Sequence, residues 1–349
     1  MTPAPMTADR PLKVGLLSFA HVHAAGYASL LRSRPDVALL TADPESALGA
    51  PGEVRGRELA EKLDVDYVDD YDELFAWAPD AVVVCSENAR HRGLTERAAE
   101  AGVHVLCEKP LATTLDDADA MISACTRSGV TLMTAYPVRF HPGFRAMRAR
   151  LHGGGLGPIR SASGTNNGRI PIAARSWFAD PELAGGGSLM DHTVHLADLL
   201  DDLLDARAVE VYAQTNRIVH PEVEVETGGL VTVTYDDGTV ATIDCSWNRP
   251  ETFPTWGGLT LTVEGAGGSA SFDAFGQAVD GFDDRSGGAV WRSYGTNLDA
   301  LMMEEFLSSI REGRPARPDG AVGRRTLQIV LAAYASATEG QPVQLPQSA

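Results

Sequence analysis

Short apolar runs alternate with longer segments of helical periodicity in the first part of the chain. Runs such as Ala81–Val84 are continuously apolar, which is typical of parallel strands buried on both faces. The predicted strands are Lys13–Leu17, Val37–Thr41, Val65–Tyr67, Ala81–Cys85, Val103–Cys107 and Thr131–Thr134. The predicted helices are His23–Ser33, Arg55–Lys62, Asp72–Trp77, His91–Ala101 and Asp116–Ser128. This alternation predicts a doubly wound α/β Rossmann domain over residues 12–136, preceded by a flexible tail at residues 1–11.

After Tyr136 the pattern changes to segments in which apolar and polar residues alternate. The clearest pair, Val231–Tyr235 and Thr239–Ile243, flanks an Asp-Gly turn, which is a strong signal for a β-hairpin. Further strands are expected at Val209–Asn216, Leu259–Glu264 and Ser269–Asp273, and helices at Asn297–Glu312 and Ala321–Thr338. The sequence therefore predicts an α+β domain with a large, open, mainly antiparallel sheet over residues 137–349.

Composition narrows the range of partners. The chain has 349 residues, 29 Lys and Arg against 47 Asp and Glu, and a net charge of −18. This length suggests two domains, and the acidic balance argues against nucleic acid and anionic membrane surfaces. No run approaches the roughly 18 apolar residues that span a bilayer, and the first 11 residues lack a signal-peptide pattern. With four dispersed cysteines expected to be reduced and buried, we predict a cytoplasmic protein.

The first strand-to-helix turn is where a Rossmann domain holds a dinucleotide pyrophosphate. Here the three glycine positions of GxGxxG are Ser18, Ala20 and His23, so the fingerprint alone fails. Asp43 ends the second predicted strand, where a carboxylate accepts hydrogen bonds from a ribose diol. This carboxylate favours NAD over NADP, and NADP stays possible if Arg55 or Arg57 folds back onto it.

Two polar segments follow the fourth and fifth predicted strands. The first is Ser86-Glu87-Asn88-Ala89-Arg90-His91, and the second is Cys107-Glu108-Lys109-Pro110. Ligands of open α/β sheets bind beyond the carboxyl ends of the strands, so both segments are expected beside the ligand. Three further motifs are Arg139-Phe140-x-Pro142, the run Gly185–Asp191 and Asp191-x-x-x-His195. Together with the two polar segments, they resemble the Gfo/Idh/MocA family of glucose-fructose oxidoreductase and inositol dehydrogenase. The resemblance extends over about residues 12–346. The first turn and Glu87 depart from that pattern.

The resemblance implies a pyridine-nucleotide oxidoreductase that acts on a sugar, cyclitol or related polyol. Asp191 and His195 are four residues apart and share a helix face, which suits a general base and its carboxylate partner. Lys109 is predicted to hydrogen-bond the reacting hydroxyl and favour its ionisation. Tyr136, Arg139 and His192 are candidate substrate contacts, although Arg139 alternatively pairs with a carboxylate. The expected cofactor-binding residues are Ser18, Phe19, Ala20, His21, Asp43, Ser86, Asn88, His91, Glu108 and Lys109.

Several histidines raise the question of a metal. His21-x-His23 and Asp191-His192-x-x-His195 offer ligand types that suit zinc, but no spacing matches a standard site, so no metal is predicted. Trp177 and Phe178 are expected either at a cleft rim or in the core.

Two other functions stay open. One is a glycoside hydrolase or epimerase that uses transient oxidation with tightly held NAD, and the other is a non-catalytic ligand sensor. An open antiparallel sheet has an outer face to cover, so we also expect a homodimer or homotetramer.

Overall fold

A computed structural model describes residues 10–283 and 288–346. The chain divides into two compact units. The first contains Met1–Ala135, Pro171–Gly185 and Asp299–Leu327, and the second contains Tyr136–Ile170, Gly186–Leu298 and Gln328–Ala349. The first unit therefore includes two later segments that the sequence assigned to the second domain. The expected tail lies mostly outside the described residues, and Arg10 pairs with Asp80 at 2.6 Å.

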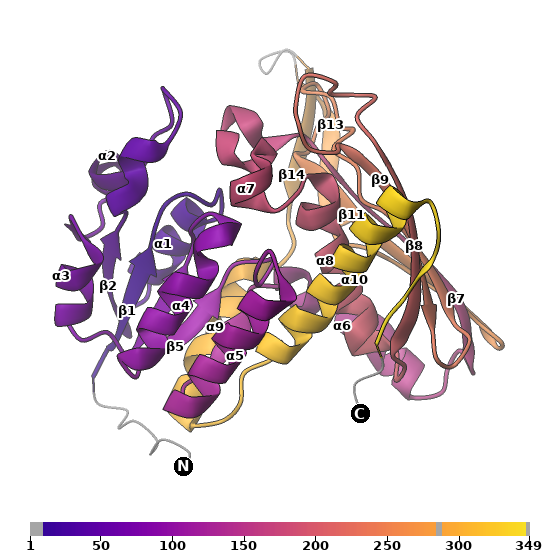
Figure 1. The fold of residues 1–349 in the computed structure, drawn as a ribbon, viewed down its shortest axis with the longest axis horizontal. Helices are drawn as coiled ribbons and strands as arrows, with labels where there is room; N and C mark the ends of the chain where they lie inside the picture. Colours follow the sequence, from indigo (N-terminus) through magenta and orange to yellow (C-terminus); the bar gives the residue numbers. More distant parts are fainter. Residues whose placement is uncertain (1–9, 284–287, 347–349) are drawn as a thin grey trace. The chain divides into compact units, whose positions relative to one another are not determined.

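The first unit is built on a six-stranded parallel sheet with the order β3-β2-β1-β4-β5-β6. The strands are β1 (Leu12–Leu17), β2 (Val37–Ala42), β3 (Tyr67–Val68), β4 (Ala81–Val84), β5 (His104–Cys107) and β6 (Leu132–Thr134). Its helices are α1 (Ala24–Arg32), α2 (Gly56–Leu63), α3 (Tyr71–Ala76), α4 (His91–Glu100), α5 (Leu115–Ser128), α7 (Pro181–Ala184), nearly all of α9 (Leu298–Glu312) and the start of α10 (Gly320–Glu339). Helices α4 and α5 lie side by side (Figure 1). The predicted Rossmann architecture is confirmed, with element ends shifted by one or two residues.

The strand order reverses between β1 and β4, and this determines where the polar segments meet. Strand β1 pairs in parallel with β2 on one side and with β4 on the other. Ligands of doubly wound sheets bind at this switch point, beyond the carboxyl ends of the strands. Residues that follow β1, β2, β4 and β5 therefore gather at one edge of the sheet.

The second unit is built on a seven-stranded sheet with the order β12-β11-β7-β10-β9-β8-β15. Among the described strands of this sheet, β7 and β10 pair in parallel and the other pairs are antiparallel, so the mainly antiparallel sheet is confirmed. The strands are β7 (Ile159–Gly168), β8 (Ala208–Asn216), β9 (Gly228–Tyr235), β10 (Val240–Asp244), β11 (Gly257–Gly265), β12 (Gly268–Asp273) and β15 (Val343–Gln344). A separate hairpin is formed by β13 (Ala278–Asp283) and β14 (Gly288–Ser293).

Helices α6 (Pro142–His152) and α8 (Ser188–Leu203) cover one face of this second sheet together with the later residues of α10. The buried core contains Leu196 and Leu200 of α8 and the inward residues Val231, Val233 and Ile243 of β9 and β10. Gly164 in β7 lets α8 approach closely, because a Cβ there would lie 2.7 Å from a methyl carbon of Leu196. A side chain at this position would require the Leu196 side chain to move.

All four cysteines are buried and unbridged, as expected. Within residues 10–283 and 288–346, the structure has no helix that is both long and apolar enough to cross a membrane.

Candidate cofactor-binding and active site

The turn after β1 is shaped by a serine in the place of the usual glycine. Ser18 has a φ of +71°, a left-handed conformation that costs a non-glycine residue roughly 1–2 kcal/mol. Its hydroxyl donates to Asp43 Oδ1 at 3.0 Å and accepts from the N–H of Ala20 at 3.1 Å. Ser18, Phe19, Ala20 and His21 are all buried. The serine therefore reproduces the tight turn and ties it to the end of β2.

Asp43 is the centre of a buried ion-pair network. Its carboxylate accepts from Arg55 Nε at 3.1 Å and Nη2 at 2.9 Å, and from the N–H of Gly56 at 3.1 Å. Arg55 Nη1 also donates to Glu87 Oε1 at 3.1 Å. Although burial lowers the pKa of Arg55, the two carboxylates outweigh it and raise that pKa above its usual value. Arg55 is therefore the arginine that folds back onto Asp43, whereas Arg57 pairs with Asp69 on the surface.

The segment Pro171–Gly185 lies over the first turn within the same unit. Arg175 Nε donates to the carbonyl of Phe19 at 3.2 Å, and Trp177 Nε1 donates to the carbonyl of Ala20 at 2.9 Å. The rings of Trp177 and Phe178 stack with centroids 4.0 Å apart, and Phe178 also contacts His21 at 5.4 Å. Both aromatic side chains are thus buried against the turn, which settles the choice in favour of the core.

Strand β5 delivers Glu108 and Lys109 to the same edge. Glu108 is fully buried, and its Oε1 lies 2.9 Å from His23 Nδ1 and 3.7 Å from His21 Nδ1. Burial alone would raise the pKa of Glu108, but the imidazoles of His21 and His23 and the ammonium of Lys109 hold it well below its usual range. Lys109 is 4% exposed and precedes Pro110 through a cis peptide bond.

Side chains that follow β4 form hydrogen bonds to carbonyl groups of the backbone nearby. Asn88 Nδ2 donates to the carbonyl of Ala184 at 2.8 Å, and Ser86 Oγ donates to the carbonyl of Glu87 at 3.2 Å. His91 Nδ1 lies 3.0 Å from the carbonyl oxygen of Pro110, which can only accept, so this nitrogen carries the proton. These contacts give His91 and Asn88 a role in positioning the Lys109 loop and α7.

In the second unit, the glycine run before α8 lets the chain approach a buried carboxylate. Glu226 accepts from the N–H groups of Gly187 at 3.0 Å and Leu189 at 2.8 Å, and from the hydroxyl of Tyr334 at 2.9 Å. A Cβ on Gly187 would lie 2.0 Å from the carbonyl oxygen of Glu226. A carboxylate at a helix N-terminus compensates the unpaired N–H groups of the first turn. Glu226 therefore fixes the start of the helix that carries Asp191 and His195.

Helix α8 presents Asp191, His192 and His195. Asp191 Oδ2 accepts from Trp247 Nε1 at 3.2 Å and lies 3.1 Å from His192 Nε2. The His195 ring meets the ring of Tyr136 edge-on, with centroids 6.0 Å apart. Asp191 is therefore oriented by an indole and an imidazole.

Arg139 is paired within the second unit. Its guanidinium donates to Asp198 at 2.6 Å and to Asp202 at 3.0 Å, and its side chain is 10% exposed. The sequence left two roles open for Arg139, a substrate contact and pairing with a carboxylate. The structure agrees with pairing.

Comparison with known proteins identifies the fold and its family. Residues 27–136 match the model "Oxidoreductase family, NAD-binding Rossmann fold", and residues 144–271 match "GFO/IDH/MocA C-terminal domain". The chain belongs to the Gfo/Idh/MocA oxidoreductase family. The predicted resemblance is confirmed by both halves of the chain.

Relatives of this Gfo/Idh/MocA chain extend over most of its length. A D-xylose 1-dehydrogenase (NADP(+)) of Haloferax volcanii is 29% identical, with 86% of this chain and 91% of that protein aligned. A myo-inositol 2-dehydrogenase of Thermotoga maritima is 27% identical, with 84% and 89% aligned. The crystal structure of GenD2 from gentamicin A biosynthesis, in complex with NAD, matches with a TM-score of 0.86 over 99% of this chain and 100% of that chain. At 23% identity, that match establishes the fold.

The first unit fits the NAD that its family model names. Ser18 supplies the left-handed turn, Ala20 is small enough for close approach, and α1 begins at Ala24 directly after the turn. Asp43 stands at the carboxyl end of β2, where a ribose is bound in such folds. The oxygens of Asp43 already accept hydrogen bonds from Ser18, Arg55 and Gly56. A ribose hydroxyl that donates to this carboxylate would therefore share it with these groups.

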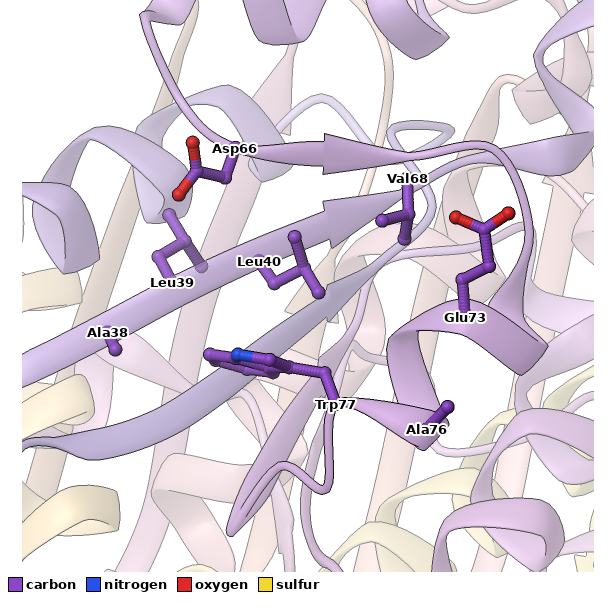
Figure 2. Close-up of a pocket in the computed structure, with 8 residues that line it drawn as sticks. All are labelled: Ala38, Leu39, Leu40, Asp66, Val68, Glu73, Ala76 and Trp77. Atoms are coloured by element: carbon purple, nitrogen blue, oxygen red, sulfur yellow. The ribbon is translucent and has the colours of Figure 1, made fainter.

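A separate pocket of about 670 Å³ lies against β2 and β3 of this Gfo/Idh/MocA Rossmann unit. Figure 2 shows the Trp77 ring beside Leu40, with the carboxylates of Asp66 and Glu73 at the border. Its lining contains none of the predicted site residues.

Sequence reasoning missed several residues that shape the family site. Glu87 appeared only as a departure from the pattern, although it is the second carboxylate partner of Arg55. Glu226 and Trp247 belong to no motif, and their roles depend on contacts 39 and 56 positions away along the chain. Acidic and apolar residues alternate from Glu222 to Glu226, so the sequence does not distinguish Glu226 from Glu222 or Glu224.

Proposed function

We propose that the chain is an NAD(P)-dependent dehydrogenase that transfers a hydride between the nicotinamide and a secondary alcohol carbon of a sugar, cyclitol or related polyol. The observation that carries this proposal is Lys109, a buried ammonium at the ligand-binding edge of an NAD-binding Rossmann sheet. The two relatives named as xylose and inositol dehydrogenases support the substrate class.

In the proposed mechanism, NAD would supply the hydride acceptor or donor when it is bound, and side chains of this chain bind, remove or return the proton. Lys109 hydrogen-bonds the reacting oxygen and stabilises its anionic form. His195 removes the hydroxyl proton as general base, and Asp191, held by Trp247, supports the charged imidazole or accepts a second substrate hydroxyl. His192 beside Asp191 and Tyr136 beside His195 are proposed to contact the substrate.

The decisive experiment is a panel of polyols and aldoses tested with NAD and NADP. Formation of reduced cofactor is expected with at least one of these substrates. Lys109→Ala should lower kcat/KM by about 10²–10⁴-fold, the usual contribution of a positioned proton-transfer group. The matched control is Lys62→Ala, which removes a surface lysine paired with Glu58, and its activity should stay at the wild-type level. Unchanged activity in Lys109→Ala would refute the assignment.

The sensor function has one observation in its favour. Arg175 and Trp177 hydrogen-bond to the carbonyls of the turn that would face the dinucleotide. Titration of the purified protein with NAD separates the two functions, because a sensor that has lost cofactor binding shows no saturation at millimolar NAD. A hydrolase or epimerase would instead retain NAD through purification and turn over without net reduced cofactor.

We also propose that the chain forms a homodimer or homotetramer through the outer face of the second sheet. This face carries Leu230, 54% exposed, and Val240, 37% exposed, on the adjacent strands β9 and β10. Pairing such faces between copies removes apolar surface from water. Light scattering should give a multiple of the 37.1 kDa chain mass, and Leu230→Arg should shift it towards the monomer. A monomeric mass at micromolar concentrations would contradict this.

A cytoplasmic location is proposed as well. Its support is the set of four unbridged, buried cysteines, which is typical of proteins from reducing compartments. Cell fractionation with a thiol count on the denatured protein tests it.

A further inference from the structure

Two histidines and a glutamate come together at the carboxyl edge of the first sheet. His21 lies in the turn after β1, His23 directly precedes α1, and Glu108 follows β5. One ligand atom from each lies within 4.8 Å of the others. Two imidazoles and a carboxylate form a common ligand set of zinc sites that keep one position open.

The spacing of these atoms suits a single ion. Ligands bound at about 2.0–2.2 Å from a tetrahedral zinc lie roughly 3.3–3.5 Å from one another. The two distances, 2.9 Å from Glu108 Oε1 to His23 Nδ1 and 3.7 Å from Glu108 Oε1 to His21 Nδ1, lie on either side of that value. The two rings are inclined by 63°, so their nitrogens approach the carboxylate from different directions.

The surrounding contacts prepare the ligands. The N–H of Lys109 donates to Glu108 Oε2 at 3.1 Å, which fixes the carboxylate while Oε1 faces the imidazoles. The N–H of His23 donates to His21 Nδ1 at 3.2 Å, so that nitrogen carries a lone pair rather than a proton. An ion would replace this long hydrogen bond.

The charge balance also favours a cation. Glu108 is a fully buried carboxylate, and the carboxyl group of Asp299 lies near enough to act electrostatically on His23. Burying carboxylates without positive charge costs several kcal/mol per ion. Lys109 supplies one positive charge beside these two carboxylates, and a metal ion held by His21, His23 and Glu108 would supply more.

We propose that His21, His23 and Glu108 bind one divalent transition-metal ion of the zinc class, with an open position for an exogenous oxygen ligand. His21 and Glu108 are also expected cofactor-binding residues, so the proposal is tested by metal binding and not by dehydrogenase activity.

The test uses the full chain without a polyhistidine tag, stripped with a chelator and titrated with Zn²⁺ against a chromophoric competitor. One equivalent is expected to bind. His23→Gln and Glu108→Gln should each weaken binding by at least about 10–100-fold, since even outer-shell changes reach that range. The matched control is His220→Gln, which removes a surface histidine 3.1 Å from Glu222 and should leave the affinity unchanged.

Co²⁺ substitution supplies a second readout. The visible absorption of bound Co²⁺ reports its ligand set, so the spectrum should change in His23→Gln and stay the same in His220→Gln. Failure of the wild type to bind Zn²⁺ stoichiometrically would overturn the proposal and leave an ordinary imidazolium–carboxylate pair. Equal affinities in the wild type and both ligand variants would overturn it too.

Discussion

Asp43 and Arg55 form a two-pronged ion pair, with Arg55 Nε and Nη2 at 3.1 and 2.9 Å from the two carboxylate oxygens, and both side chains are buried. The pair joins the carboxyl end of β2 to the start of α2 at the place where the family binds its nucleotide. We therefore expect this ion pair to affect both the stability of the protein and its choice between NAD and NADP.

For stability, Arg55→Met should lower the free energy of unfolding by about 3–5 kcal/mol. The substitution removes the cation that pairs with the buried Asp43 and leaves Glu87 with Arg90 at 3.6 Å, and an unpaired buried charge has this cost. Chemical denaturation at neutral pH measures the loss. Arg57→Met is the matched control, because Arg57 pairs with Asp69 in solvent and its loss should leave the midpoint nearly unchanged. Similar losses in both variants would contradict this account.

For cofactor choice, NAD should bind at least about tenfold more tightly than NADP, which corresponds to 1.4 kcal/mol. Asp43 presents a like charge to the additional 2′-phosphate, and Arg55 already donates to Asp43 and Glu87. Asp43→Asn should narrow the ratio of the two dissociation constants, whereas Asp69→Asn on the surface should not. Calorimetric titration with both dinucleotides checks this, and a wild-type preference for NADP would show that Arg55 serves the phosphate instead.

His91 should make the protein less stable below neutral pH. Burial lowers its pKa from the usual value despite the attraction of Glu108, so the folded chain keeps this ring neutral while the unfolded chain protonates it. The stabilisation is complete above about pH 6.5 and is lost as the pH falls through the lowered pKa, with a slope of at most about 1.4 kcal/mol per pH unit.

His91→Asn keeps a donor for the carbonyl of Pro110 and cannot titrate, so the unfolding free energy of this variant should depend less on pH between about 7 and 5. His152→Asn replaces an exposed histidine, and its curve should parallel the wild type. Parallel curves for all three proteins would mean that His91 does not contribute.

The Rossmann half was predictable because its strands are apolar runs and two of its helices, α4 and α5, are followed by Gly102 and Gly129. Gly129, for example, has a φ of +68° at the end of α5, as its position suggested. The second sheet was only partly predictable. Strand β7 contains small and polar residues and no apolar alternation, yet it pairs with both β10 and β11. Its strand conformation is imposed by these neighbours, which a local pattern does not report.

In the candidate site, too, the sequence indicated some residues and not others. Motifs in the sequence made Glu108, Lys109 and Asp191 candidate site residues. Their partners were not, because Arg175 and Trp247 reach the site through hydrogen bonds that join distant parts of the chain. The expected NAD turn lacked its glycines, and the structure shows that Ser18 adopts the required left-handed conformation.

Gly187 should tolerate no side chain. Gly187→Ala would place a methyl group 2.0 Å from the backbone oxygen of Glu226, and backbone cannot move aside cheaply. We expect a loss of roughly 1–3 kcal/mol or more in unfolding free energy. The control is Gly26→Ala in α1, where nothing lies within 4 Å of the added carbon, and a gain of up to about 1 kcal/mol is expected. A neutral Gly187→Ala would show that α8 can shift away from Glu226.

The catalytic roles on α8 can be separated by kinetics. His195→Asn should lower kcat by about 10²–10⁴-fold, because it removes the proposed general base. His192→Asn should mainly raise KM, because His192 is a proposed substrate contact. Trp247→Phe removes the indole N–H 3.2 Å from Asp191, so it should lower kcat through a misplaced carboxylate while NAD affinity stays constant. If His192→Asn lost more kcat than His195→Asn, the base would be the imidazole 3.1 Å from Asp191.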